Sequence, residues 1–143
     1  MVGRLAKKAE CFGDKEALEE ILSAKDPVQM KALGRQVRGF DAKVWDEIKF
    51  GVVLNASYLK FSQNAPLRDF LLSTGSKVLV EASPVDKIWG IGLAASDENA
   101  QNPMKWRWQS LLGFALMMVR DEIVKVYKNV HLCDARELNL DHL

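Results

Sequence analysis

The last third of the chain carries the pattern that most restricts its fold. Between residues 108 and 126, apolar side chains recur at every third or fourth position, which over about five turns is the repeat of an amphipathic helix. The residues of this stripe are Trp108, Leu111, Leu112, Ala115, Leu116, Val119, Ile123 and Val126. Because a stripe of this length has to be buried against other elements, it predicts a long helix within a packed, mainly helical domain.

Shorter helix signals precede this segment. Side-chain oxygens of aspartate cap the first turn of a helix, and proline fits the first helical position. The predicted caps and first-turn residues are Asp14, Asp26-Pro27, Asp41 and Pro66. These helices are expected to end before Asp26, at Gly34, near Phe61 and at Gly75.

One stretch departs from the helical repeat. Residues 77–82 are short and β-branched, which predicts a strand, and residues 88–92 are a candidate for a second extended piece. The polar residues 96–103 are predicted to form a surface loop. The predicted fold class is therefore mainly α, with five or six helices: a single multihelical domain over residues 1–143 with a small β element.

Composition narrows the class of protein. A chain of 143 residues with 48% hydrophobic residues is long enough for one compact core and too short for two ordinary domains. Its 20 basic and 19 acidic residues give no global argument for binding nucleic acid or an anionic membrane. The sequence has no run of 18 or more apolar residues, so it predicts no membrane-spanning helix. Its first residues do not resemble a secretory signal, so we expect a cytoplasmic protein.

The cysteines and histidines indicate neither a disulfide nor a metal site. Cys11 and Cys133 lie far apart without CxxC spacing, which favours two unpaired thiols in a reducing compartment. His131 and His142 lie in a polar tail, residues 128–143, without a cluster of ligands. We therefore expect no metal site. Within the tail, three leucines are candidates to dock on the domain: Leu132, Leu138 and Leu140.

Three places could carry chemistry. Arg35 and Arg38 flank the end of a predicted helix and could bind phosphate through planar, paired donors, although composition alone favours a solvated surface pair. Residues 81–92 combine two carboxylates, an indole and two glycines, which fits either a ligand loop or an ordinary turn with a core tryptophan. Trp106 is either exposed for a ligand or packed like Trp108.

A family resemblance adds to these features. The matching residues are Lys8-Ala9, Phe12-Gly13-Asp14, Ile21-Leu22, Asp26-Pro27, Lys31, Leu33 to Val37, Phe40-Asp41, Trp45, Lys60 to Asn64, Leu67, Leu71-Leu72, Thr74-Gly75, Val80 to Ser83, Asp86, Ile88 to Gly92, Asn102-Pro103, Trp106, Leu111 to Gly113, Ala115 to Met117 and Val119-Arg120. In order and spacing this resembles the NADAR family over about residues 5–125, most specifically at residues 80–92.

The resemblance implies an N-glycosidase without metal or organic cofactor. Members of the family act on phosphoribosylated pyrimidine intermediates of riboflavin synthesis, and some remove ADP-ribose from modified guanine. Nucleic acid therefore enters only as a carrier of a modified base. Such bonds break through an oxocarbenium-like transition state, so a carboxylate near the anomeric carbon and a positioned water are the expected tools.

Site residues follow from the same resemblance. Asp86 matches the active-site aspartate, which would stabilise the cation or orient water, and Trp45 matches the tryptophan that would line the base or sugar pocket. Trp45 also lies on an apolar stripe and could be a core residue. The expected substrate-binding residues are Arg35 for phosphate, Trp89 for the pocket wall, and Lys8 and Asn64 for polar contacts.

The beginning of the chain departs from the family pattern. The family carries an active-site glutamate seven positions before the lysine that Lys8 matches, and this count leads to Met1. The resemblance thus predicts that the family's N-terminal segment is lacking, which would lower the rate by about 10²–10⁴. It leaves open a catalytically impaired domain that binds a ligand or a protein partner. Apolar surface exposed at this end favours a homodimer.

Overall fold

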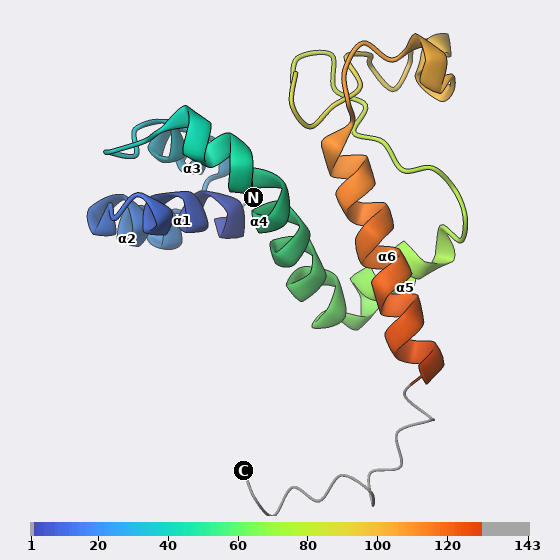
Figure 1. Cartoon of the computed structure of the whole chain (residues 1–143), viewed down its shortest axis with the longest axis horizontal. Helices are drawn as coiled ribbons and strands as arrows, with labels where there is room; N and C mark the ends of the chain where they lie inside the picture. Colours follow the sequence, from blue (N-terminus) through green and yellow to red (C-terminus); the bar gives the residue numbers. More distant parts are fainter. Residues whose placement is uncertain (1, 130–143) are drawn as a thin grey trace, which may run out of the picture. The chain divides into compact units, whose positions relative to one another are not determined.

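The computed structural model describes residues 2–129, and every regular element within this range is a helix (Figure 1). The elements in chain order are α1 (Val2–Cys11), α2 (Lys15–Ser23), α3 (Pro27–Arg35), α4 (Ala42–Ser62), α5 (Ala65–Ser73), the 3₁₀ turns η1 (Glu98–Gln101) and η2 (Pro103–Lys105), and α6 (Leu111–Asn129). The mainly α class is confirmed. The chain forms two compact units, Met1–Ser57 and Tyr58–Leu143. The assignment of residues 1–143 to one domain stays a prediction.

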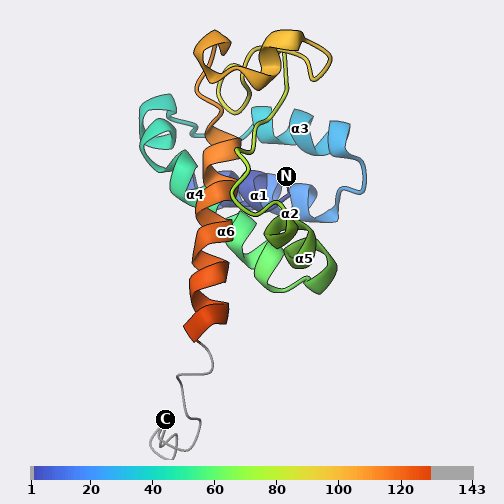
Figure 2. The same cartoon turned by 90° about the vertical axis from the view of Figure 1, so that its right-hand side faces the viewer.

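The first unit has a core that α1, α2 and α3 build together by packing against one another. Figure 2 shows these three helices grouped around one another at the N-terminal end of the chain. The buried residues of this core are Leu5, Ala9, Ala17, Ile21, Met30 and Val37. Ile21 is fully buried, which contributes about 1.5–3 kcal/mol to folding. Helix α1 was not among the predicted helices, although Leu5 and Ala9 are one helical turn apart.

Aspartate side chains begin α2, α3 and α4, as the sequence predicts. Asp26 accepts hydrogen bonds from the backbone nitrogens of Val28 and Gln29, at 3.2 and 3.1 Å, with Pro27 in the first turn of α3. Asp41 accepts from Lys43 and Val44 at the start of α4, at 2.8 and 3.1 Å. These bonds satisfy backbone donors that have no partner within the helix.

Asp14 joins the start of α2 to the segment after α3. Its Oδ1 accepts from Ala17 N at 3.2 Å and from Arg38 Nη2 at 2.8 Å, and its Oδ2 accepts from Arg38 N at 2.8 Å. The carboxylate is buried, and Arg38 Nη2 also donates to Glu16 at 2.7 Å. The hydrogen bonds from Arg38 hold the pKa of Asp14 far below its usual range. Arg38 is therefore a structural residue of this unit.

In the second unit, α5 packs against α6, and a buried arginine links them to the turn that follows α5. Arg120 is 6% exposed, and its Nη1 donates to Thr74 Oγ1 and to the Lys77 carbonyl, both at 2.8 Å. The buried face of α6 consists of Gly113, Ala115, Val119, Arg120 and Ile123. Helix α6 begins at Leu111, so the predicted stripe is confirmed except at its two ends: Trp108 precedes the helix and is half-buried, and Val126 is exposed.

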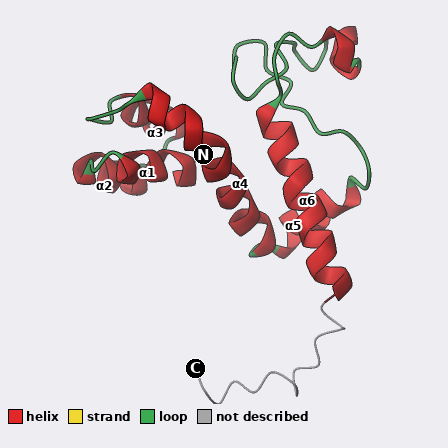
Figure 3. Ribbon diagram, in the orientation of Figure 1, coloured by secondary structure: helices red, strands yellow, loops and turns green. Residues whose placement is uncertain are grey.

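The predicted β element is wrong within residues 2–129. Figure 3 draws the segment between α5 and α6 as loop and short helical turns, without a strand. Residues 77–82 and 88–92 are not paired in a regular ladder. Instead, Ile91 N donates to the Glu81 carbonyl at 3.0 Å and Gly92 N to the Ser83 carbonyl at 3.1 Å, while the carbonyls of residues 89–91 accept from residues 107–112. Backbone groups satisfied in this irregular way leave no ladder to form.

The structure also bears on the predicted surface loop and on the question of a membrane-spanning helix. The predicted surface loop 96–103 contains η1, with Asp97 accepting from Asn99 N at 2.9 Å. None of the described helices is both long enough and apolar enough to span a membrane. The predictions for Leu132, Leu138, Leu140, Cys133 and both histidines fall on residues 130–143 and lie outside the described residues.

We expect acid to weaken the first unit through Asp14. Because the pKa of Asp14 is lowered in the folded state, its contribution to stability is complete above the unfolded pKa of about 3.9 and is lost as the pH falls below it. Thermal melts between pH 7 and pH 2.5 should show a steeper loss of Tm for the native protein than for Asp14→Asn. Identical pH profiles would contradict this role of the carboxylate.

Gly113 is required by a close backbone contact. A Cβ at this position would overlap the Leu79 carbonyl oxygen and lie 2.8 Å from Ser110 Oγ. We expect Gly113→Ala to lower the free energy of unfolding by about 1–3 kcal/mol, as overpacking does. The matched control is Gly51→Ala in α4, where no atom lies within 4 Å of the added Cβ. This control should raise stability by about 0.5–1 kcal/mol, measured by urea unfolding.

Candidate active site

Asp86 lies at the centre of a tight turn, which we call the Asp86 loop (residues 83–92). Its Oδ1 accepts hydrogen bonds from Ile88 N at 3.1 Å and Trp89 N at 3.0 Å. Its own backbone nitrogen donates to Ser83 Oγ at 3.1 Å, and its carbonyl accepts from Gly90 N at 3.0 Å. The residue is thus held on both sides by local bonds.

The second carboxylate oxygen of Asp86 is available for chemistry. Oδ2 accepts no hydrogen bond from residues 2–129, and the side chain is half-buried. A carboxylate with one oxygen fixed and the other free can face developing positive charge without first having to reorient. Positive charge of this kind develops in an oxocarbenium-like transition state.

The segment before α6 anchors the Asp86 loop. Arg107 N donates to the Ile91 carbonyl at 2.9 Å, Ser110 N to the Gly90 carbonyl at 3.1 Å and Leu112 N to the Trp89 carbonyl at 3.3 Å. Gly92 has a φ of +78°, and a Cβ there would lie 2.7 Å from that of Arg107. The loop therefore rests closely on residues 107–112.

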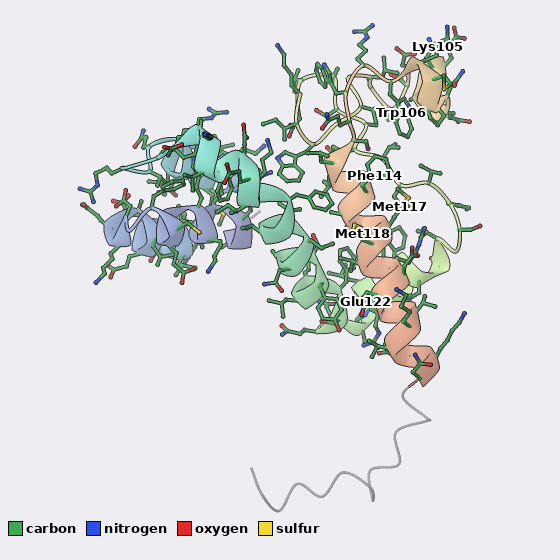
Figure 4. The ribbon with its side chains drawn as sticks, in the orientation of Figure 1. Lys105, Trp106, Phe114, Met117, Met118 and Glu122 are labelled. Carbon is green, nitrogen blue, oxygen red and sulfur yellow. The ribbon has the colours of Figure 1, made fainter. Side chains whose placement is uncertain are left out.

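Trp89 and Trp106 both belong to the second unit. Trp89 is 6% exposed, so most of its indole contacts protein. Trp106 Nε1 donates to the Ala100 carbonyl at 2.9 Å, and its ring packs on the core of Ile91, Leu93 and Ala100. Figure 4 shows Trp106 next to Lys105, ahead of α6, on which Phe114, Met118 and Glu122 follow one another. For Trp106, packing is the better explanation.

In the first unit, Lys8 contacts a backbone carbonyl and an aromatic ring. Its Nζ donates to the Gly34 carbonyl at 2.7 Å and lies 3.9 Å from the centroid of the Phe40 ring. Burial, and secondly the charge of Arg4, lower the pKa of Lys8. Arg35 follows Gly34 at the end of α3 and is exposed, without an ion pair among the described residues. Lys8 and Arg35 are therefore brought to the same end of α3.

The two remaining predicted residues lie on α4 and at the start of α5. Trp45 is half-buried in the first turn of α4. Asn64 is exposed and caps α5, because its Oδ1 accepts from Leu67 N at 3.3 Å. Lys8, Arg35 and Trp45 belong to the first unit, and Asn64, Asp86 and Trp89 to the second. Their roles in substrate binding stay predictions.

Sequence reasoning gave no site role to two residues that the structure brings into contact with the predicted ones, although Phe40 is among the residues that carry the family resemblance. Phe40, which contacts Lys8 and lies 5.3 Å from Phe12 between ring centroids, follows a glycine in an irregular segment. Ser110, which bonds to the Asp86 loop, occurs among polar and aromatic residues before α6. Neither falls in a periodic pattern, so only the tertiary contacts show what these two side chains and backbones touch.

The hollow with the best-defined lining lies away from the predicted site residues. A hollow of about 460 Å³ between α2 and α3 is lined by Glu20, Ser23, Ala24, Lys25, Gln29 and Leu33. It contains none of the predicted site residues. Within residues 2–129, no group of three or more histidine, cysteine, aspartate or glutamate side chains is arranged to hold a metal ion.

Comparison with known proteins decides the family. A model of the NADAR domain matches residues 4–124. The chain belongs to the NADAR family. It is 46% identical to an N-glycosidase of Acanthamoeba polyphaga mimivirus over 118 residues, which cover 82% of this chain and 69% of the relative. It is 33% identical over 133 residues to a riboflavin biosynthesis protein of Vibrio vulnificus, covering 92% of this chain and 33% of that protein.

A solved structure of another NADAR relative has the same fold. The NMR structure of YbiA from Escherichia coli matches with a TM-score of 0.65 and 29% identity, over 87% of this chain and 66% of that one. Curated YbiA from this organism is named an N-glycosidase. The family match includes Lys8, Arg35, Trp45, Asn64, Asp86 and Trp89, since all lie within residues 4–124.

We expect the charge of Arg4 to contribute, after burial, to the lowered pKa of Lys8. Because the charge of Arg4 lowers the pKa of Lys8, Arg4→Gln should raise that pKa toward its ordinary value. Lysines labelled by ¹³C reductive methylation would report the pKa in an NMR titration. Lys7 is an internal control, because its pKa is raised by Glu10 and should not change. An unchanged Lys8 titration would show that burial alone lowers its pKa.

Proposed function

We propose that this NADAR chain is an N-glycosidase that hydrolyses the bond between a ribose phosphate and an aminopyrimidine. The observation that carries this proposal is the free Oδ2 of Asp86 on a carboxylate whose other oxygen is held by two backbone donors. The names of the relatives support it, since the viral protein and YbiA are N-glycosidases and the Vibrio protein belongs to riboflavin biosynthesis. ADP-ribosylated guanine is the second candidate substrate.

In this proposal Asp86 acts on the ribose ring. As the glycosidic bond stretches, positive charge builds up between the anomeric carbon and the ring oxygen, and Asp86 Oδ2 stabilises it. Water then attacks the anomeric carbon and releases one proton to solvent, and the base leaves with a proton from solvent or from a neighbouring acid. Oδ1 stays bonded to Ile88 N and Trp89 N, so the carboxylate does not turn during the reaction.

Substrate contacts complete the proposal. Arg35 is exposed and free of ion pairs among the described residues, so its guanidinium can bind a phosphate through paired donors. Trp45 keeps part of its indole exposed and would stack on the base, while Trp89 would support the loop from inside. Lys8 and Asn64 would add polar contacts. A homodimer and a cytoplasmic location are further proposals that do not affect this chemistry.

The test is hydrolysis of both substrates by the native protein and by Asp86→Asn. This substitution keeps an oxygen that can accept from Ile88 N and Trp89 N, and it removes the negative charge. We expect kcat to fall by about 10²–10³, the usual loss of one charge-stabilising group, with little change in KM. Product would be followed as free ribose 5-phosphate or ADP-ribose, with Tm measured for each protein.

Asp97→Asn is the matched control. Asp97 caps a neighbouring turn through Asn99 N, so the same substitution there changes charge without changing the proposed site. It should keep the native kcat. Native turnover in Asp86→Asn would remove Asp86 from the mechanism. Absence of turnover in the folded native protein would favour the alternative, a domain that binds its ligand without cleaving it.

A further inference from the structure

Ser110 has an unusual backbone conformation next to the Asp86 loop. Its φ is +52°, and it is the only residue other than glycine with a positive φ among residues 2–129. A residue with a Cβ is disfavoured in this left-handed region, which glycine adopts without a steric penalty. The conformation at this position therefore has to be imposed by the surrounding contacts.

The hydroxyl of Ser110 does not compensate for this conformation. Ser110 is 1% exposed, and its Oγ has no hydrogen-bond partner within the described chain. A buried hydroxyl without a partner is itself unfavourable. Glycine would remove both penalties, so the Ser110 side chain contributes little here. Its burial also excludes direct contact with a substrate.

The backbone of Ser110 changes the direction of the chain and forms hydrogen bonds to the Asp86 loop and to α6. It turns the chain from the irregular segment 107–109 into α6, because the Ser110 carbonyl accepts from Phe114 N at 3.2 Å and so begins the helix. This bend lets Ser110 N reach the Gly90 carbonyl and Leu112 N reach the Trp89 carbonyl. Gly113, which abuts the Leu79 carbonyl, prevents the start of α6 from moving in that direction.

These bonds continue to Asp86. Gly90 and Trp89, whose carbonyls are held by Ser110 and Leu112, donate their own N–H groups to the carbonyl and to Oδ1 of Asp86, respectively. A change in the direction of the chain at residue 110 would thus shift the two donors that hold Asp86. The effect would reach Asp86 without any contact between Ser110 and the substrate.

We infer that Ser110 is a positioning residue for Asp86, and that its left-handed backbone rather than its hydroxyl carries this role. The inference rests on the proposed function, in which the Asp86 carboxylate stabilises the transition state. A misplacement of a catalytic group by about 1 Å can cost about 100-fold in rate. Substitutions that oppose the left-handed conformation should therefore lower kcat, and substitutions that permit it should not.

The experiment compares four variants at position 110. Ser110→Val is β-branched and resists a positive φ, so we expect kcat to fall by about 10–100-fold at nearly constant KM. Ser110→Thr resists it while keeping the hydroxyl, and it is the milder variant if valine does not fold. Ser110→Gly should keep the native kcat and raise Tm. Ser110→Ala should keep the native kcat, because it removes only the hydroxyl.

Two measurements separate positioning from a general loss of stability. Val119→Ala removes buried volume from α6 away from the loop, so it should lower Tm while keeping kcat. Amide hydrogen exchange at Trp89 and Gly90 reports the bonds to Asp86 directly. It should become faster in the valine and threonine variants and stay native in the glycine variant. Circular dichroism at the assay temperature would confirm that each variant is folded.

The outcomes are distinct. Native kcat and native amide exchange in a folded Ser110→Val or Ser110→Thr protein would overturn the inference. So would a loss of kcat in Ser110→Gly or Ser110→Ala equal to that in Ser110→Val, because the hydroxyl would then be the active element. If the native protein turned over neither substrate, the proposed function would fail. The exchange rates at Trp89 and Gly90 would still decide whether residue 110 positions Asp86.

Discussion

The backbone hydrogen bonds between residues 107–112 and the carbonyls of Trp89, Gly90 and Ile91 are the constraint on which the candidate site depends. The Asp86 loop has no regular ladder to hold it, and its own turn is closed only by local bonds. Without the anchoring donors, the carbonyls of residues 89–91 would have to find other partners. The start of α6 therefore stabilises the loop and sets the geometry of Asp86 at the same time.

Two aspartates of this chain show how the same local bond leads to different roles. Asp14 and Asp86 each accept backbone N–H groups through Oδ1, as capping residues do. Asp14 is buried and gives both oxygens to Arg38, which lowers its pKa and makes it a structural residue. Asp86 remains half-buried with Oδ2 free. The difference lies in the surrounding charges and not in the turn itself.

Local signals predicted the helices well, and they failed where backbone partners come from distant residues. The caps at Asp14, Asp26 and Asp41 are all present, because a capping bond reaches only two or three residues along the chain. The strand predicted at residues 77–82 is absent, although its β-branched composition fits a strand. Its neighbours are the Asp86 loop and α6, and these offer an irregular set of partners in place of a ladder.

The sequence by itself determined the mainly helical class, the starts of α2, α3, α4 and α5 and the NADAR family. These depend on periodicity, on capping bonds of short range and on a motif whose residues are close together. Only the tertiary structure decided that Arg38 donates hydrogen bonds to Asp14, that Trp106 packs in a core, and that the chain bends at Ser110 next to the Asp86 loop. Each of these depends on groups brought together by folding, and no local pattern in the chain encodes such contacts.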